Sequence, residues 1–375
     1  MVNTTRASRR SGSKVNKDRN RNNLRIGYVP YISTFSAPGD RRRFVHYART
    51  RNLDFEIADP KKKYDLVVLS ENADLSVWHR YEHGRLVYDL IDAYLAIPKT
   101  NLKGLLRGTA KFVTRQSRYL QVNHWGAVAR ICQRADAVVC TTLEQQKDIS
   151  QFNPNVHIVL DVHTSVIQSV KTDYAAHKPF RIVWEGLPQT IHSLNELEPV
   201  FKDLQKRHDL ELHLVTDLDY YKYLRRYGKS NIKDTVKGVL PNITIHQWDE
   251  ANCAQRISSC DLAVIPLALN DPFAAGKPEN KLLFFWRLAM PVVTSGTPAY
   301  ARAMQMSGVN TSCTTQDEWF DQLERLIMDE ALRRRVGLLG RDFVEREVTE
   351  ETLLSRWDHV FLSIGFDFQR DFIHE

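Results

Sequence analysis

The sequence predicts an α/β protein made of two Rossmann-like, doubly wound domains. The chain has 375 residues, 43% of them hydrophobic, which is enough for two cores. From Leu24 onward, short apolar runs typical of strands alternate with helical patterns, and this alternation indicates parallel sheets. One polar, poorly periodic stretch, residues 166–178, separates two such series and is expected to be a linker.

The first series, residues 24–165, predicts the N-terminal domain. Its expected strands are short apolar runs bounded by turn residues, namely LRIGYVPYI, FEIA, YDLVVLS, RLVYDLI, ADAVVCTT and VHIVLDV. The turn that ends at Asp40 is expected to let this residue cap a helix over Arg41–Arg51. A long helical region separates the fourth and fifth strands.

The second series, residues 179–350, predicts the C-terminal domain. Its expected strands share the same apolar character and are FRIVWEG, LELHLVT, NITIHQW, LAVIPL and PVVT. Helices are expected between the strands, over Leu194–His208, Tyr220–Tyr227, Cys253–Cys260 and Glu279–Leu288. Residues 316–362 also have a helical pattern.

Charge and composition exclude several classes of protein. Residues 1–23 carry seven Lys/Arg and one Asp, and so hold most of the net charge of +7. We expect this basic tail to be a disordered, solubilising extension, with no nucleic acid as partner. No stretch reaches the roughly 18–20 apolar residues that cross a bilayer, so a cytoplasmic protein is expected. Five cysteines without CxxC spacing indicate reduced thiols.

The stretch Asp261–Ser295 reads as strand, loop, helix and strand. Its loop, Asn270–Asn280, falls at the carboxyl end of a strand, where parallel sheets bind ligands. Gly276 would let a ligand approach the backbone, and the helix N-terminus beyond it favours a phosphate. Lys277 and Lys281 add positive charge. The alternative is an ordinary surface loop flanked by lysines.

Residues 280–295, NKLLFFWRLAMPVVTS, resemble the donor-binding segment of GT-B glycosyltransferases of the family 4, or group 1, type of bacterial surface polysaccharide synthesis. The resemblance implies two Rossmann-like domains facing a central cleft, with a nucleotide-sugar donor in the C-terminal half and the acceptor in the N-terminal half. It also implies that a C-terminal helix within residues 351–375 crosses back to the first domain. Basic side chains and helix N-termini would neutralise the pyrophosphate, so no cofactor and no metal are expected.

The segment departs from the family in one respect. Two glutamates that the family uses for the sugar and the ribose are replaced here by Gly276 and Phe284, and Glu279 is the candidate substitute. The remaining donor-binding candidates lie in the same loop or after the first strand of the second half, where Gly186 would allow close approach and Glu185 could bind a hydroxyl. The donor-binding set is Glu185, Gly186, Gly276, Lys277, Glu279, Asn280 and Lys281.

Acceptor chemistry is expected in the N-terminal half. Asp40 and Asp92 follow predicted strands, and either one could take the proton of an acceptor hydroxyl. Both could instead be helix caps. Arg41, Arg42 and Arg43 beside Asp40 could bind an anionic acceptor or a phosphate. The DxD pattern at residues 217–219 resembles a metal motif of the other glycosyltransferase fold, but it lies in a chain with two Rossmann-like halves, so no metal site is assigned.

A basic stripe runs along a predicted helix over Leu102–Leu120, in a region that has no acidic residue. Lys103, Arg107, Lys111 and Arg115 recur at helical spacing beside an apolar face. Three interpretations stay open: a surface helix that buries its apolar face, a helix that lies on an anionic membrane to reach a lipid-linked acceptor, and a binding site for an anionic polysaccharide.

The sequence therefore predicts a metal-independent glycosyltransferase that transfers a sugar from a nucleotide-sugar donor to a saccharide or glycolipid acceptor. It would work in the cytoplasm or at the inner face of the plasma membrane. Two alternatives are a polyol-phosphate transferase of GT-B type and a non-catalytic GT-B-like binding protein.

Overall fold

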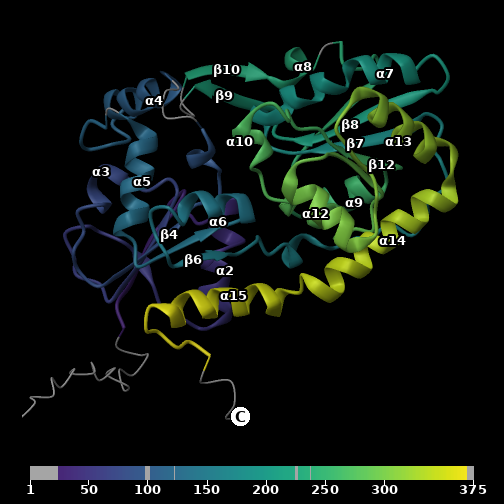
Figure 1. Cartoon of the computed structure of the whole chain (residues 1–375). Helices are drawn as coiled ribbons and strands as arrows, with labels where there is room; N and C mark the ends of the chain where they lie inside the picture. Colours follow the sequence, from purple (N-terminus) through teal and green to yellow (C-terminus); the bar gives the residue numbers. More distant parts are fainter. Residues whose placement is uncertain (1–23, 98–101, 122, 224–226, 237, 370–375) are drawn as a thin grey trace, which may run out of the picture.

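Two six-stranded parallel sheets form the two halves of the molecule (Figure 1). The computed structural model describes residues 24–97, 102–121, 123–223, 227–236 and 238–369. In the N-terminal sheet the strand order is β2-β1-β3-β4-β5-β6, and in the C-terminal sheet it is β11-β8-β7-β12-β13-β14. The α/β class predicted from the sequence is confirmed.

The N-terminal sheet is covered by helices on both faces. Its strands are β1 (Ile26–Val29), β2 (Glu56–Ile57), β3 (Leu66–Ser70), β4 (Arg85–Asp89), β5 (Ala137–Cys140) and β6 (Val156–Ile158). Its helices are α1 (Pro38–Arg41), α2 (Phe44–Thr50), α3 (Leu75–Trp78), η2 (Tyr94–Ala96), α4 (Leu102–Val113), α5 (His124–Arg134), α6 (Leu143–Ile149) and η3 (Thr164–Val166). Strand β3 is buried along its whole length, as expected for a central parallel strand.

The C-terminal half repeats this arrangement and adds a hairpin. Its strands are β7 (Phe180–Glu185), β8 (Leu210–Thr216), β9 (Asp219–Tyr223), β10 (Tyr227–Asn231), β11 (Ile243–Gln247), β12 (Leu262–Ile265), β13 (Val292–Ser295) and β14 (Ser312–Cys313). Its helices are η4 (Pro188–Leu197), α7 (Glu198–Leu204), α8 (Ile232–Thr235), α9 (Cys253–Ser258), α10 (Pro272–Ala275), α11 (Asn280–Arg287), α12 (Pro298–Ser307), α13 (Gln316–Met328) and α14 (Glu330–Glu347).

The last described helix, α15 (Glu350–Ser363), belongs to the core of the N-terminal half. It follows α14 directly and lies below α2 in Figure 1. Trp357 and Phe361 of α15 pack against Phe44 and Tyr47 of α2. The buried carboxylate of Asp358 accepts hydrogen bonds from the Tyr47 hydroxyl at 2.7 Å and from the guanidinium of Arg51 at 2.6 Å. The final turns of the chain are therefore an integral part of the first domain.

Arg43 is buried at the junction between α1 and α2. Its Nε and Nη2 donate to the two carboxylate oxygens of Asp89 at 2.7 and 2.6 Å, and its Nη1 donates to Asp161 at 3.0 Å and to the carbonyl of Val159 at 2.9 Å. The side chain is fully buried. One guanidinium thus joins the end of β4 to the segment that follows β6.

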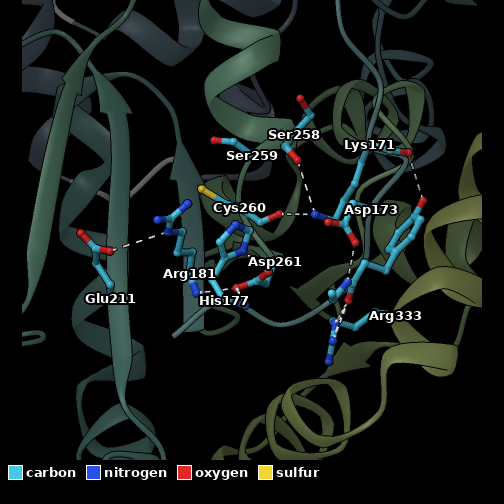
Figure 2. Close-up of polar contacts among 12 residues, drawn as sticks. Lys171, Asp173, His177, Arg181, Glu211, Ser258, Ser259, Cys260, Asp261 and Arg333 are labelled. Carbon is cyan, nitrogen blue, oxygen red and sulfur yellow. Dashed lines mark hydrogen bonds and ion pairs between the residues drawn. The ribbon is translucent and has the colours of Figure 1, made fainter. Parts of the chain in front are cut away.

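The segment between β6 and β7, predicted to be a linker, is tied to the C-terminal half (Figure 2). Buried Asp261 accepts from the ring of His177 at 2.7 Å and from the backbone N–H of Arg181 at 2.8 Å. Lys171 donates to the carbonyl of Cys260 at 2.7 Å, and Arg333 of α14 donates to the carbonyl of Tyr174 at 2.6 Å. The polar side chains of this segment, such as Lys171 and His177, therefore bind the C-terminal half.

Several element predictions are wrong in detail. Arg41–Arg51 forms two short helices because the chain turns at Arg43 to bury its guanidinium. The helix predicted over Tyr220–Tyr227 is not found: Tyr220–Tyr223 lies in β9 and Tyr227 begins the antiparallel β10, in keeping with the strand preference of tyrosine, and residues 224–226 lie outside the described residues. Leu194–His208 is divided between η4 and α7, because Pro199 starts a new helix.

The Arg43 contacts predict a large effect on stability. Replacing Arg43 by methionine leaves the carboxylate of Asp89 buried without its partner, which costs about 3–5 kcal/mol. Urea unfolding should show this loss for Arg43→Met and a change of less than about 0.5 kcal/mol for the exposed control Arg49→Met. A loss below about 1 kcal/mol for Arg43→Met would show that the pair is not needed for folding.

Candidate functional site

Lys281 lies at the centre of the candidate site in the C-terminal half. It stands in the first turn of α11, and its Nζ donates to the carbonyl of Glu185 at 2.5 Å, at the end of β7. The ammonium also lies 5.0 Å from the ring centre of Trp184. A Cβ on Gly186 would come within 2.6 Å of this Nζ. Gly186 is therefore the residue that lets Lys281 reach the end of β7.

The charges of Glu185 and Lys277 have opposite effects on the pKa of Lys281. Burial lowers the pKa of Lys281 to about 8, while the Glu185 charge raises this pKa and the Lys277 charge lowers it. Lys277 itself lies 6.0 Å from the ring centre of Phe273. A lysine has three N–H donors, and the carbonyl of Glu185 satisfies one of those of Lys281. An anion bound here would restore full charge to Lys281 and take up its remaining donors.

Glu279 stands at the N-cap position of α11 but does not cap the helix. Its Oε2 is buried and has no hydrogen-bond partner among the described residues. Burial raises the pKa of Glu279 to about 7. Burial raises the pKa of Tyr300 as well, with further contributions from Glu279 and Glu185. Tyr300 therefore lies near both Glu279 and Glu185, and Glu279 has hydrogen-bonding capacity left for a ligand.

Gly276 and Asn280 hold the loop against the N-terminal half. A Cβ on Gly276 would come within 2.5 Å of the Cβ of Ala93, so the close approach expected for a ligand is made by the protein itself. Asn280 accepts a hydrogen bond from the backbone N–H of Asp161 at 3.1 Å. Phe273 of α10 packs on Tyr94 of η2, with ring centres 5.4 Å apart. The predicted donor-binding loop is thus also a contact between the halves.

The three arginines after β1 have different environments. Arg41 donates to Glu250 at 2.9 Å and lies 5.3 Å from the ring centre of Trp248, both in the other half. Arg42 is half-buried, and its Nε has no hydrogen-bond partner among the described residues. Its charge lowers the pKa of Cys253 in α9, so its guanidinium lies at the boundary between the halves.

Two residues predicted to act on the acceptor, Arg43 and Asp40, are buried and bonded within the protein. Arg43 is enclosed by its ion pairs, so it is not available to an acceptor or a phosphate. Asp40 is fully buried and does not cap a helix, because Ala37 holds the N-cap position of α1. Its oxygens instead accept from the Tyr28 hydroxyl at 2.7 Å and from the backbone N–H of Tyr31 at 2.8 Å. A general base needs an accessible oxygen, and Asp40 has none.

Asp92 has a partner that the sequence analysis missed. Its backbone N–H donates to Oε2 of Glu71 at 3.0 Å. Glu71 directly follows β3, and β3 pairs with β4 through Ser70 and Asp89, so both side chains lie at one edge of the sheet. The available signal was one acidic residue directly after β3 and another three residues after the end of β4.

One residue of the predicted basic stripe, Arg107, contacts the protein itself. Arg107 of α4 donates to the hydroxyl of Tyr94 at 3.0 Å and lies over its ring. Arg115 is exposed and lies beyond the end of the helix at Val113, while Lys111 is half-buried. The side chain of Lys103 lies outside the described residues. Among the described residues, no helix is long and apolar enough to cross a membrane.

Groups of at least three His, Cys, Asp or Glu with metal-binding geometry do not occur within the described ranges. In the DxD pattern, Asp217 accepts from Gln247 at 2.7 Å and Asp219 accepts from Asn231 at 3.3 Å. The two carboxylates therefore have separate side-chain partners.

Comparison with known proteins identifies the fold. No family model matches the chain, and neither does any curated protein. Among solved structures, TarM matches with a TM-score of 0.56 and 10% identity, over 79% of this chain and 54% of TarM. A variant of S. aureus TarM in complex with fondaparinux, alpha-GlcNAc-glycerol and UDP matches with a TM-score of 0.51 and 11% identity, over 79% and 55% of the two chains. This chain spans about half the length of TarM. Its two Rossmann-like halves form a GT-B fold.

Proposed function

We propose that this protein is a glycosyltransferase that transfers a sugar from a nucleotide-sugar donor to a saccharide or glycolipid acceptor in cell-surface polysaccharide synthesis. The observation that carries the proposal is Lys281, a half-buried ammonium at the carboxyl end of β7 whose contact with the Glu185 carbonyl uses one of its three donors. The GT-B fold of TarM, whose variant binds UDP and a GlcNAc-glycerol, supports the same function.

The donor diphosphate would lie against the first turn of α11. Lys281 and Lys277 supply positive charge there, and the free N–H groups of the helix N-terminus favour a phosphate. Arg42 approaches the same region from the other half and has an unpaired Nε within the described structure. These cations would stabilise the negative charge that develops on the leaving diphosphate, so we expect turnover to persist without a divalent metal.

Asp92 is the remaining candidate for the proton acceptor. In the proposed step, the acceptor oxygen forms a bond to the anomeric carbon while the bond from that carbon to the diphosphate breaks. The electron pair of the broken bond stays on the diphosphate, and the proton of the hydroxyl passes to the Asp92 carboxylate. Asp92 is half-buried at the carboxyl edge of the N-terminal sheet, which suits a reaction between the halves.

The donor site is tested by removing its central charge. Lys281→Ala should weaken binding of a nucleoside diphosphate by about ten- to a hundredfold, because it loses a charge-assisted hydrogen bond of about 1.5–3 kcal/mol. Thermal shift with a panel of nucleoside diphosphates measures this loss and identifies the base. Since the Lys281 pKa is lowered to about 8, wild-type affinity should fall as the pH rises through that value, and the variant should lack this dependence.

Lys233→Ala, which removes an exposed lysine of α8, is the matched control and should bind like the wild type. Equal affinity of Lys281→Ala and wild type would remove Lys281 from the donor site. A panel in which no nucleoside diphosphate raises the melting temperature of the wild type would overturn the proposed function.

The role of Asp92 predicts a loss of rate without a loss of donor binding. Asp92→Asn keeps the shape of the side chain but cannot take a proton, so kcat should fall by about two to four orders of magnitude. Donor affinity, measured by thermal shift, should not change. Asp54→Asn, on an exposed residue of the same half, serves as the control. Near-normal turnover in Asp92→Asn would show that the proton goes elsewhere.

We also propose that α4 docks on an anionic membrane surface, where a lipid-linked acceptor would be found. Leu106 and Val113, which lie two turns apart on one face of α4, are 69% and 73% exposed. Tyr119 and Leu120, just beyond the helix, are also exposed. Exposed apolar side chains beside basic residues are typical of helices that lie in a membrane interface.

Liposome flotation tests the docking. Binding should require phosphatidylserine, weaken with salt and fail when Lys103, Lys111 and Arg115 are changed to glutamate, since each basic residue contributes about 1 kcal/mol near an anionic surface. The same triple reversal at Lys61, Lys62 and Lys63, an exposed basic cluster of the same half, is the control. Equal recovery with neutral and anionic vesicles, or none with either, would contradict the proposal and favour a soluble acceptor.

A further inference from the structure

A pair of acidic side chains, Glu71 and Asp92, occupies the carboxyl edge of the N-terminal sheet. Glu71 follows β3 directly, and Asp92 lies shortly after the end of β4. The hydrogen bond from the Asp92 N–H to Oε2 of Glu71, at 3.0 Å, joins the two loops. Both residues are half-buried. A ligand at this edge would therefore meet two carboxyl groups together.

The hydroxyl of Tyr31 completes the cluster. Its backbone N–H donates to buried Asp40 at 2.8 Å, and a Cβ on Gly39 would come within 2.4 Å of its ring, so the ring is held in place. The hydroxyl oxygen is buried and has no hydrogen-bond partner in the described part of the chain. Among the neighbouring carboxylates, Glu71 raises the pKa of this hydroxyl the most. The Tyr31 hydroxyl is therefore fixed in place, is affected by the charges of both carboxyl groups, and can bind a polar ligand.

Glu71 keeps its proton at neutral pH. Burial and, next, the charge of Asp92 together raise the pKa of Glu71 to about 8. The titratable and charged groups that face Glu71 come from β4, the loops after β1 and β4, η2 and α4, and they are Tyr31, Tyr88, Asp89, Asp92, Tyr94 and Arg107. Asp89 is paired with Arg43. Arg107 is the cation among these groups, and its charge lowers the pKa of Glu71.

We propose that Glu71, Asp92 and Tyr31 form the subsite for an uncharged acceptor hydroxyl, with Glu71 as a hydrogen-bond donor. The proposal rests on the proposed glycosyl transfer. The acceptor hydroxyl donates to the carboxylate of Asp92 and accepts from the carboxylic acid of Glu71, and Tyr31 binds a neighbouring oxygen of the same sugar or polyol. An acceptor sugar that carries a carboxylate or phosphate at this position is repelled by the charge of Asp92.

Acceptor kinetics test the charge state of the subsite. With p-nitrophenyl hexosides as acceptors, wild-type kcat/KM should fall as the pH rises above about 8, because a second negative charge then appears beside Asp92. Glu71→Gln stays a neutral donor at every pH, so its kcat/KM should lose this decline. Glu82→Gln, on an exposed glutamate of the same half, should behave like the wild type. The matching p-nitrophenyl glucuronide should be a poor acceptor.

Two outcomes would overturn the inference. A preference of the wild type for the glucuronide would contradict an uncharged acceptor. A loss of activity in Glu71→Gln as large as that in Asp92→Asn would mean that Glu71 takes the proton.

A second measurement does not depend on turnover. In protein labelled with 13C at the glutamate carboxyl groups, the resonance that is missing from Glu71→Gln should titrate near pH 8, and Asp92→Asn should shift this titration to lower pH. Titration of that resonance near the ordinary glutamate value of about 4.3 would refute the inference. If no nucleotide sugar is turned over, the proposed function fails while the titration still decides the state of Glu71.

Discussion

The buried ion pair between Arg43 and Asp89 organises the N-terminal half and its boundary with the other half. Because the guanidinium also binds Asp161 and Val159, it fixes the loop after β1 against the ends of β4 and β6. This arrangement turns the neighbouring Arg41 and Arg42 toward the C-terminal half, where they meet Glu250 and the surroundings of Cys253. A buried charge that must be paired thus determines where two other charges can act.

The fold class could be predicted because strand and helix patterns alternate along the whole chain. Local boundaries were harder, since they depend on contacts between distant residues. Nothing local in the sequence near Arg43 says that its partner is Asp89, so the break between α1 and α2 could not be predicted. The helix predicted over Tyr220–Tyr227 is wrong, because β9 covers Tyr220–Tyr223, where the tyrosines favour a strand.

In the candidate site, too, local sequence patterns predicted some residues, while others depend on contacts between distant parts of the chain. Lys281 and Gly186 were found because they follow strands of a parallel sheet, and they lie together at the end of β7. Gly276 was expected to make room for a ligand, but the methyl group of Ala93 occupies that room. Glu71 was missed because its protonation depends on burial and on Asp92, a residue of another loop. The residue types at strand ends can be predicted from the sequence. Their charge states cannot, because they depend on burial and on charges that the folded sheet brings together.

Helix α15 has a consequence for the order in which the protein is made. Leu354, Trp357, Val360 and Phe361 belong to the same apolar cluster as Ile26 and Phe44, which leave the ribosome far earlier. Domains generally fold in turn during synthesis, the N-terminal one first. Here the first domain cannot close its core until the C-terminal half has been translated. Until then the apolar face that α15 covers stays exposed to water, which makes the nascent chain prone to aggregation during that interval.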